Sequence, residues 1–272
     1  MLRLRVLLLV VVALVVAGSA GAAPGAQPKH VRVVKRHGAL TATVTYRVQH
    51  RATGDVTLAI RRNGQLLLEH RLCPPRGLGP TECDWLAFRS LAFRQVGGRT
   101  PAVIVNLYWS WDVTFIAFVG PRPHLIRHDW FRAGYLGHRL NGHYYFVSGD
   151  NRFMCRFASC AASWLPSQTW AVRAGRLVNV TKDVGVYARA NAKRAWRWYI
   201  GPHGRRSTDD HGIGIFAGWC ADEYILERGS VCQRVLRREL AAGRLRGYGV
   251  SGQSFARRLN RDLVRWGYKH RQ

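Results

Sequence analysis

The chain has 272 residues, of which 42 are Lys or Arg and only 15 are Asp or Glu, so its formal net charge is +27. So few carboxylates argue against chemistry that needs clusters of them, such as glycoside hydrolysis or calcium binding. The length and an apolar fraction of 47% allow a core in one large domain or in two small ones.

The cationic residues are almost all arginines, since the chain has only five lysines. The planar guanidinium fork suits phosphate and carboxylate groups better than the point charge of a lysine does. We therefore expect affinity for anionic polymers at the cell surface, such as wall polymers, lipid head groups or nucleic acid. A solvated surface that reflects only an arginine-rich composition stays open as the alternative.

The N-terminus has the layout of a secretory signal peptide. Arg3 and Arg5 precede an unbroken apolar run of eleven residues, 6–16, and small residues follow as far as Ala23. The run is shorter than the roughly 20 residues that a membrane helix needs. We predict a signal peptide over 1–22 and a secreted protein, extracellular or attached to the cell surface, with no later membrane segment.

Six cysteines follow the predicted signal peptide, and an even number in an exported protein indicates disulfides. They form three pairs that are close in sequence: Cys73 with Cys83, Cys155 with Cys160, and Cys220 with Cys232. Six cysteines allow 15 pairings, so this local pairing rests on proximity alone. Their spacing is not that of a zinc site, and we predict no metal there.

Residues 23–37 are basic and predict a mobile arm. Beyond them, apolar and polar residues alternate over 40–49, which is typical of a half-buried strand. Asn63-Gly64 is the two-residue turn of a type I′ hairpin. The strands that it joins are expected over 56–62 and 65–71.

Two segments share a glycine turn followed by a strand-like run, 94–108 and 139–148. Each precedes a further candidate strand, 114–119 and 169–172. A period of about 45 residues can indicate propeller blades, although two copies cannot close a propeller. We therefore expect an antiparallel β-rich region over 38–180 that contains a pair of related, blade-like units.

From residue 181 to 272 the pattern is helical. Residues 186–200 carry alanines on one face and are followed by Gly201-Pro202, which stops a helix. The predicted fold class is thus α+β: an antiparallel β-rich N-terminal region followed by a C-terminal helical region packed on it.

Three more helical segments are expected before the C-terminus. Ser230 and Gln233 predict a capping box at the start of one of them, with 213–226 as its hairpin partner. The final helix is indicated by apolar residues that share a face: Phe255, Leu259, Leu263 and Trp266.

Several segments resemble a known family. They are 101–108 (PAVIVNLY), 146–153 (FVSGDNRF) and 157–181, with further likeness over 216–226 and 258–268. The family comprises uncharacterised secreted bacterial proteins with segments similar to FG-GAP, or integrin-type, repeats. The resemblance implies secretion and repeated β-units, and it implies no particular activity.

The first expected helix is the candidate binding site. Its cations alternate with aromatic residues, so they could pair with phosphates while the rings stack on sugars. The candidate residues are Arg189, Lys193, Arg194, Trp196 and Arg197. In the alternative interpretation, Trp196 docks this helix onto the β region and the cations are solvated.

An enzyme is less favoured by the sequence, which contains no GxSxG, HExxH or SxxK motif and implies no cofactor. The acid–base candidates are His128-Asp129, Asp150 and Asp209-Asp210-His211. Two hypotheses therefore stay open, a non-catalytic protein that binds anionic polymers and a secreted hydrolase with a site near Asp150. Asp150 beside Arg152 is also typical of a structural turn carboxylate.

The turns at 94–99 and 139–143 correspond to acidic calcium loops in the resembled family, but here they contain no carboxylate. Arg94 and Arg139 stand where the first ligand would be. Calcium prefers 6 to 8 oxygen ligands, mostly carboxylates, so calorimetry should detect no tight calcium binding by the folded protein. Tight binding would contradict this interpretation of the turns.

Overall fold

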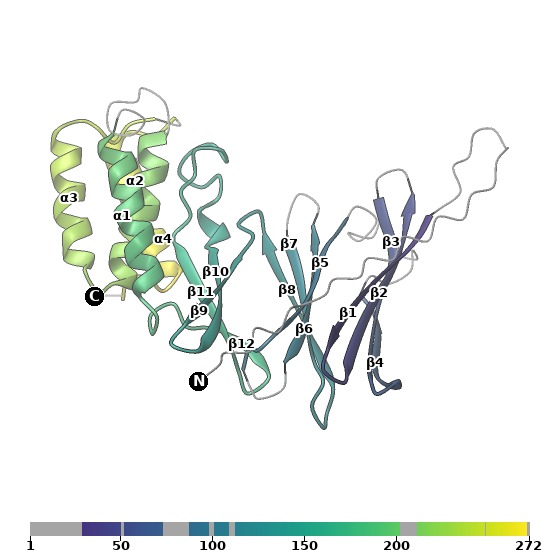
Figure 1. Cartoon of the computed structure of the whole chain (residues 1–272). Coiled ribbons are helices and arrows are strands. Elements are labelled where there is room, and N and C mark those ends of the chain that lie inside the picture. The colour runs from purple at the N-terminus through teal and green to yellow at the C-terminus, as the bar shows by residue number, and fades with distance from the viewer. Residues whose placement is uncertain are drawn as a thin grey trace, which may run out of the picture.

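The computed structural model describes residues 29–49, 52–72, 87–97, 101–108, 112–201, 211–247 and 249–270. The predicted signal peptide and the predicted Cys73–Cys83 bridge lie outside these ranges. Within them, twelve antiparallel strands form three four-stranded sheets, and four helices follow (Figure 1). The predicted α+β class, β-rich and then helical, is confirmed.

Sheet 1 contains β1 to β4 in chain order, which are Lys29–His37, Leu40–Gln49, Ala52–Arg62 and Gln65–Arg71. The alternation predicted for β2 places Leu40, Ala42 and Val44 in the core. At the predicted type I′ turn, Asn63 and Gly64 have φ angles of 50° and 86°.

The mobile arm predicted for 23–37 is wrong for its second half. Residues 29–37 form β1, which pairs with β2 from Lys29 opposite Val48 to His37 opposite Leu40. Alternate side chains of β1 are half-buried, as expected of a strand with one face on the protein. Gly38, at φ 55°, supplies the tight turn into β2.

Sheet 2 contains β5 to β8, which are Ala87–Arg94, Ala102–Tyr108, Asp112–Phe118 and His124–Phe131. Sheet 3 contains β9 to β12, which are Leu136–Leu140, His143–Gly149, Ser167–Arg173 and Arg176–Asn179. These two sheets contain the two predicted repeat units. Sheet 1 is a third four-stranded unit that the weak repeat in the sequence did not reveal.

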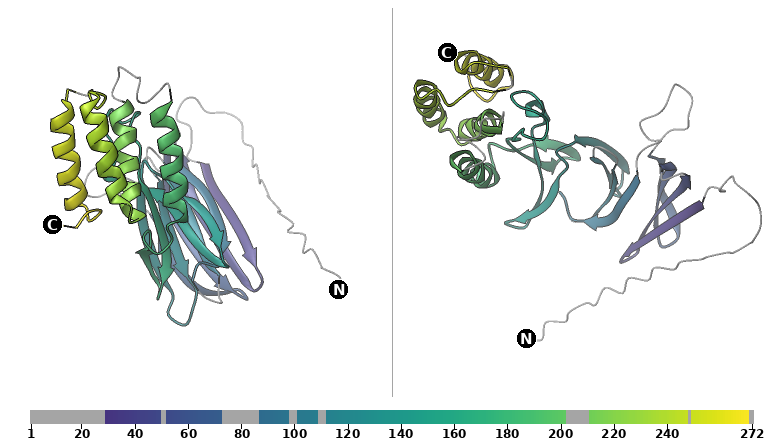
Figure 2. Two further views of the ribbon diagram at one scale, coloured as in Figure 1. Left: turned by 90° about the vertical axis from the view of Figure 1, so that its left-hand side faces the viewer. Right: turned by 90° about the horizontal axis from the view of Figure 1, so that it is seen from above.

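The sheets follow one another in an arc, with the helices at one end (Figure 2). Sheet 2 lies in the middle because both of its faces are apolar. In β6, Val103, Val105 and Leu107 join the core shared with sheet 1. Ala102 and Ile104, on its other face, join the core shared with sheet 3. Burial on both faces explains the nearly continuous apolar run of this strand.

The helices are α1 Val186–Ile200, α2 His211–Ile225, α3 Gly229–Ala241 and α4 Gly252–Arg265. The predicted bounds of α1 are confirmed, and its alanine face is buried. Among the described residues, no helix is long and apolar enough to cross a membrane.

The second helix is the centre of the helical region because it is apolar nearly all round, which is the pattern of a buried helix. Its glycines let the loop before β11 approach closely. A Cβ at Gly214 would lie 2.5 Å from the carbonyl oxygen of Ala162, and one at Gly218 would overlap the carbonyl of Trp164. The loop therefore packs directly on the helix backbone.

Cysteine pairing follows the prediction at both described sites. One disulfide joins Cys155 to Cys160 in the loop before β11, and the other joins Cys220 of α2 to Cys232 of α3. The predicted capping box is wrong, because Ser230 lies inside α3, whose start has no side-chain cap. Gln233 instead donates to Tyr224 and Asn260.

A buried carboxylate of α2 joins the helices to sheet 3. Asp222 accepts a hydrogen bond from the backbone N–H of Ser167 in β11 (2.8 Å) and another from the side-chain amide of Asn191 in α1 (2.7 Å). Burial raises the pKa of Asp222 well above its ordinary value, although these two hydrogen bonds oppose the effect. The folded protein therefore holds a proton on Asp222 more tightly than the unfolded chain does.

This raised pKa predicts how stability depends on pH. Between the ordinary value of 3.8 and the higher folded value, rising pH favours the unfolded chain, which loses its proton first. The free energy of unfolding of the wild type, relative to Asp222→Asn, should fall across this window by up to about 1.4 kcal/mol per pH unit. Urea titrations at several pH values measure this difference, and a constant difference would contradict the prediction.

Candidate functional site

The five candidate residues of α1 do not share one surface. Arg189, Lys193 and Trp196 lie on one side of the helix, as their spacing of four and three residues requires, and they line a groove. Arg194 lies elsewhere. Its guanidinium donates to Asn191 Oδ1 (2.9 Å) and sits 5.3 Å from the ring centre of Trp164.

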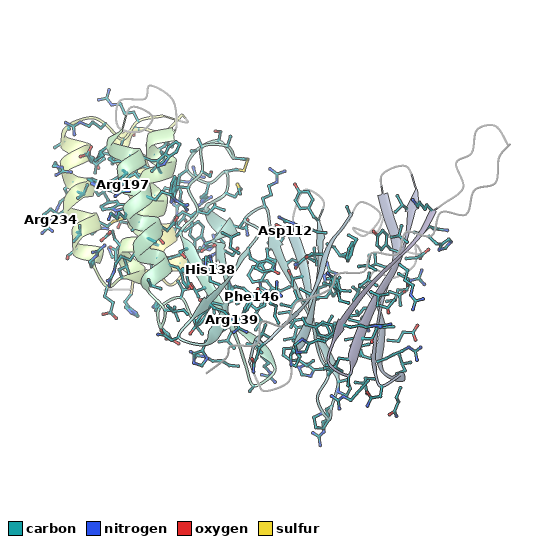
Figure 3. The ribbon with its side chains drawn as sticks, viewed as in Figure 1. Asp112, His138, Arg139, Phe146, Arg197 and Arg234 are labelled. Atoms are coloured by element: carbon teal, nitrogen blue, oxygen red, sulfur yellow. A yellow bond between two sulfur atoms is a disulfide. The ribbon has the colours of Figure 1, made fainter. Side chains whose placement is uncertain are left out.

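Arg197 is exposed in the last turn of α1 and does not line the groove (Figure 3). Three members of the predicted set, Arg189, Lys193 and Trp196, therefore line one groove, and the other two do not. The helix is also held by Tyr199, which is fully buried beside Trp196 and donates to Glu239 Oε2 (3.0 Å).

The helical groove, of about 500 Å³, runs between α1, α2 and α3. Its apolar surface comes from all three helices, and the ring centres of Trp196 and Trp219 are 4.7 Å apart. Its lining residues are Arg189, Ala192, Lys193, Trp196, Trp219, Glu223, Arg228, Val231 and Val235. The volume falls within the range of about 300–1,000 Å³ that is common for ligand sites.

Three cations and one carboxylate line the helical groove. Arg189 and Lys193 are exposed and have no ion-pair partner among the residues that the structure describes. Arg228 donates to Glu223 Oε1 (2.8 Å), whereas Glu223 Oε2 is buried with no hydrogen-bond partner in that part of the chain. The groove thus combines aromatic rings with a net positive charge.

Sequence reasoning missed the contributions of α2 and α3 to this groove. Trp219 and Glu223 come from α2, and Arg228 precedes α3. They lie close to Trp196 only after the helices pack. The sequence feature that could have indicated these contributions is the predicted Cys220–Cys232 bridge, because it places α2 beside the start of α3.

The candidate catalytic aspartate has a structural environment. The side chain of Asp150 is 3% exposed, and both of its oxygens accept hydrogen bonds from Arg152. One oxygen also accepts a hydrogen bond from the hydroxyl of Tyr268 (2.7 Å). Burial raises the pKa of Tyr268 well above its ordinary value, and the negative charge of Asp150 acts in the same direction. Asp150 therefore holds the C-terminal segment against the start of the loop after β10.

His128 and Asp129 also contact neighbouring side chains. His128 packs edge-on against Trp130, with ring centres 4.2 Å apart, and burial lowers its pKa while Asp129 acts in the opposite direction. Asp129 pairs with Arg127 (3.3 Å). Asp209 and Asp210 lie outside the described residues. Within the described part of the chain, no three metal-ligating side chains form a group.

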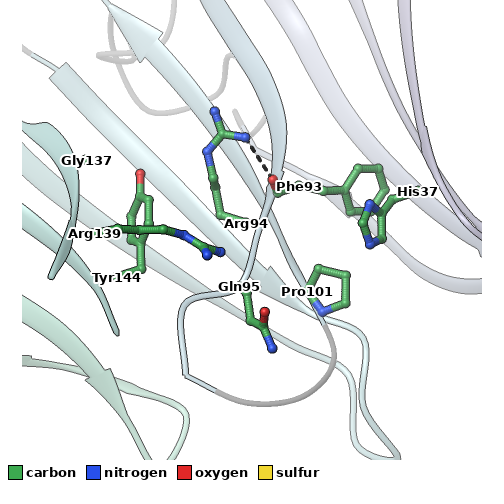
Figure 4. Close-up of a pocket in the computed structure, with 8 residues that line it drawn as sticks. All are labelled: His37, Phe93, Arg94, Gln95, Pro101, Gly137, Arg139 and Tyr144. Atoms are coloured by element: carbon green, nitrogen blue, oxygen red, sulfur yellow. Dashed lines mark hydrogen bonds between the residues drawn. The ribbon is translucent and has the colours of Figure 1, made fainter. Parts of the chain in front are cut away.

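The turn residues Arg94 and Arg139 lie together, although 45 positions separate them in the sequence. Both line a second recess, between the sheets (Figure 4). This proximity was not predicted, because the sequence contains no signal for the stacking of sheets 2 and 3.

No protein-family model, curated protein or solved structure matches the chain. The resemblance to secreted proteins with FG-GAP-type segments therefore stays a prediction from the residues quoted above.

The structural role of Asp150 can be measured. Asp150→Ala should lower the free energy of unfolding by about 2 kcal/mol, because the buried Tyr268 hydroxyl and the part-exposed Arg152 lose their shared acceptor. Asp183→Ala is the matched control. Asp183 forms an exposed ion pair with Arg173 (3.0 Å), so its loss should change stability by less than about 0.5 kcal/mol. Equal effects in thermal unfolding would contradict the assigned role.

Proposed function

We propose that the chain is an exported, non-catalytic protein that binds anionic polymers in the helical groove. The observation that carries the proposal is the combination of the Trp196–Trp219 ring pair with Arg189 and Lys193 in one recess. The cations can bind acidic groups of a polymer while the rings contact the flat faces of its sugars. The two disulfides support export, because such bonds persist mainly outside the reducing cytosol.

The three blade-like sheets support the proposed kinship with secreted proteins that carry FG-GAP-type repeats. The hydrolase alternative near Asp150 gains no support from its surroundings, because the lone pairs of its carboxylate already serve Arg152 and Tyr268. Cell-wall polymers and nucleic acid both present sugars beside phosphates, and they fit the groove better than lipid head groups alone.

Binding can be tested with wall teichoic acid, single-stranded DNA and anionic lipid vesicles as separate probes. The variant Arg189→Gln/Lys193→Gln should bind the first two less tightly than the wild type does. On single-stranded DNA, its salt slope should be smaller by about 1.4, which corresponds to two lost phosphate contacts.

The matched control is Arg237→Gln/Arg257→Gln, which removes the same charge from exposed positions of α3 and α4 outside the groove. It should retain most of the affinity and of the salt slope. Equal losses in both variants would mean that binding depends on net charge alone, and tighter binding to vesicles would point to lipid. Either result would contradict the proposal.

A further inference from the structure

A second recess, the inter-sheet cleft, lies where the first strands of the three sheets end. These strands, β1, β5 and β9, are each an edge strand of their own sheet. His37 ends β1, Arg94 ends β5, and Arg139 lies in β9 (Figure 4). The cleft has a volume of about 420 Å³, so it can hold a ligand of the size of a sugar phosphate.

The described residues that line the cleft carry only positive charge. None of the described residues that line it is Asp or Glu. Arg94 donates one N–H to the backbone carbonyl of Phe93 (3.0 Å), and neither Arg94 nor Arg139 has a carboxylate partner in the described part of the chain. Two arginines, one from sheet 2 and one from sheet 3, therefore line a recess in which the described lining residues supply no counter-charge.

A tyrosine of β10, Tyr144, also lines the cleft. Burial raises the pKa of Tyr144, and the charges of Arg94 and Arg139 oppose this effect. The hydroxyl keeps its proton at neutral pH and can donate it to an anion. Gly137 makes room for it, because a Cβ at this position would overlap the Tyr144 hydroxyl.

The remaining wall is aromatic. The rings of His37 and Phe93 stack with their centres 5.6 Å apart, which joins sheet 1 to sheet 2 at the rim of the cleft. This wall can contact the organic part of a ligand whose anionic group lies between the arginines.

We propose that the inter-sheet cleft binds a phosphomonoester of a small organic molecule, with the phosphate held by Arg94, Arg139 and Tyr144. Two guanidinium groups balance the charge of a phosphate dianion, and each presents two parallel N–H groups that match its oxygens. The proposal is independent of polymer binding in the helical groove, since the two recesses share no residue.

Calorimetry at low ionic strength tests the assignment with three probes: inorganic phosphate, ribose 5-phosphate and succinate. Both phosphates should bind the full chain, ribose 5-phosphate more tightly because its sugar contacts the aromatic wall. Arg94→Gln/Arg139→Gln should weaken both by about tenfold or more, since charge-assisted bidentate pairs are lost. Tyr144→Phe should weaken them less.

The matched control is Arg122→Gln/Arg132→Gln, which removes two exposed arginines outside the cleft. It should leave both affinities unchanged. The single variant Arg139→Gln repeats the test if the double variant unfolds at a lower temperature. No phosphate binding, equal weakening by the control, or tighter binding of succinate would each overturn the proposal.

Discussion

The scarcity of carboxylates constrains the whole structure. Among the described residues, five acidic residues are buried, and they are Asp150, Asp222, Glu223, Glu239 and Asp262. All five accept hydrogen bonds from arginines or from buried polar groups. Glu239 of α3 accepts a hydrogen bond from the hydroxyl of Tyr199 in α1. Asp262 of α4 accepts a hydrogen bond (2.7 Å) from Arg156 in the loop before β11. The acidic residues thus fasten the helices to one another and to sheet 3.

This use of the carboxylates determines what the surface can do. A buried acidic residue cannot neutralise a distant arginine, so within the described ranges cations such as Arg189 and Lys193 are exposed with no ion-pair partner. Most of them are solvated, and a solvated cation contributes little by itself. Where the packing forms a recess around such cations, as in the helical groove and the inter-sheet cleft, an external anion can meet several donors together. The two recesses differ in chemistry, because one has a tryptophan pair and the other has two arginines and a tyrosine.

Local features of the fold could be predicted from the sequence. The hairpin at Asn63-Gly64 and the bounds of α1 depend on residues within a few positions of each other, and both agree with the structure. The strand β1 was missed because its basic residues outweighed a weak alternation. The prediction of a capping box was wrong because the side chain of Gln233 donates hydrogen bonds to residues of other helices.

Long-range features were not predictable in this way. The position of sheet 2 depends on apolar faces that meet only when three sheets stack. Half of the helical groove depends on the packing of α2 and α3 against α1. The inter-sheet cleft unites Arg94 with Arg139 through the same stacking. In each case the contact that decides the arrangement joins residues that are far apart in the chain. A single sequence contains no signal that pairs such residues.

The most direct test of polymer binding follows the indole N–H signals in ¹H–¹⁵N spectra while wall teichoic acid is added. If the helical groove holds the polymer, the signals of Trp196 and Trp219 should shift in a saturable way. Those of Trp130 and Trp170, which pack between sheets 2 and 3, should stay in place. Unchanged signals from Trp196 and Trp219 in a protein that still binds the polymer would contradict the assignment of the site.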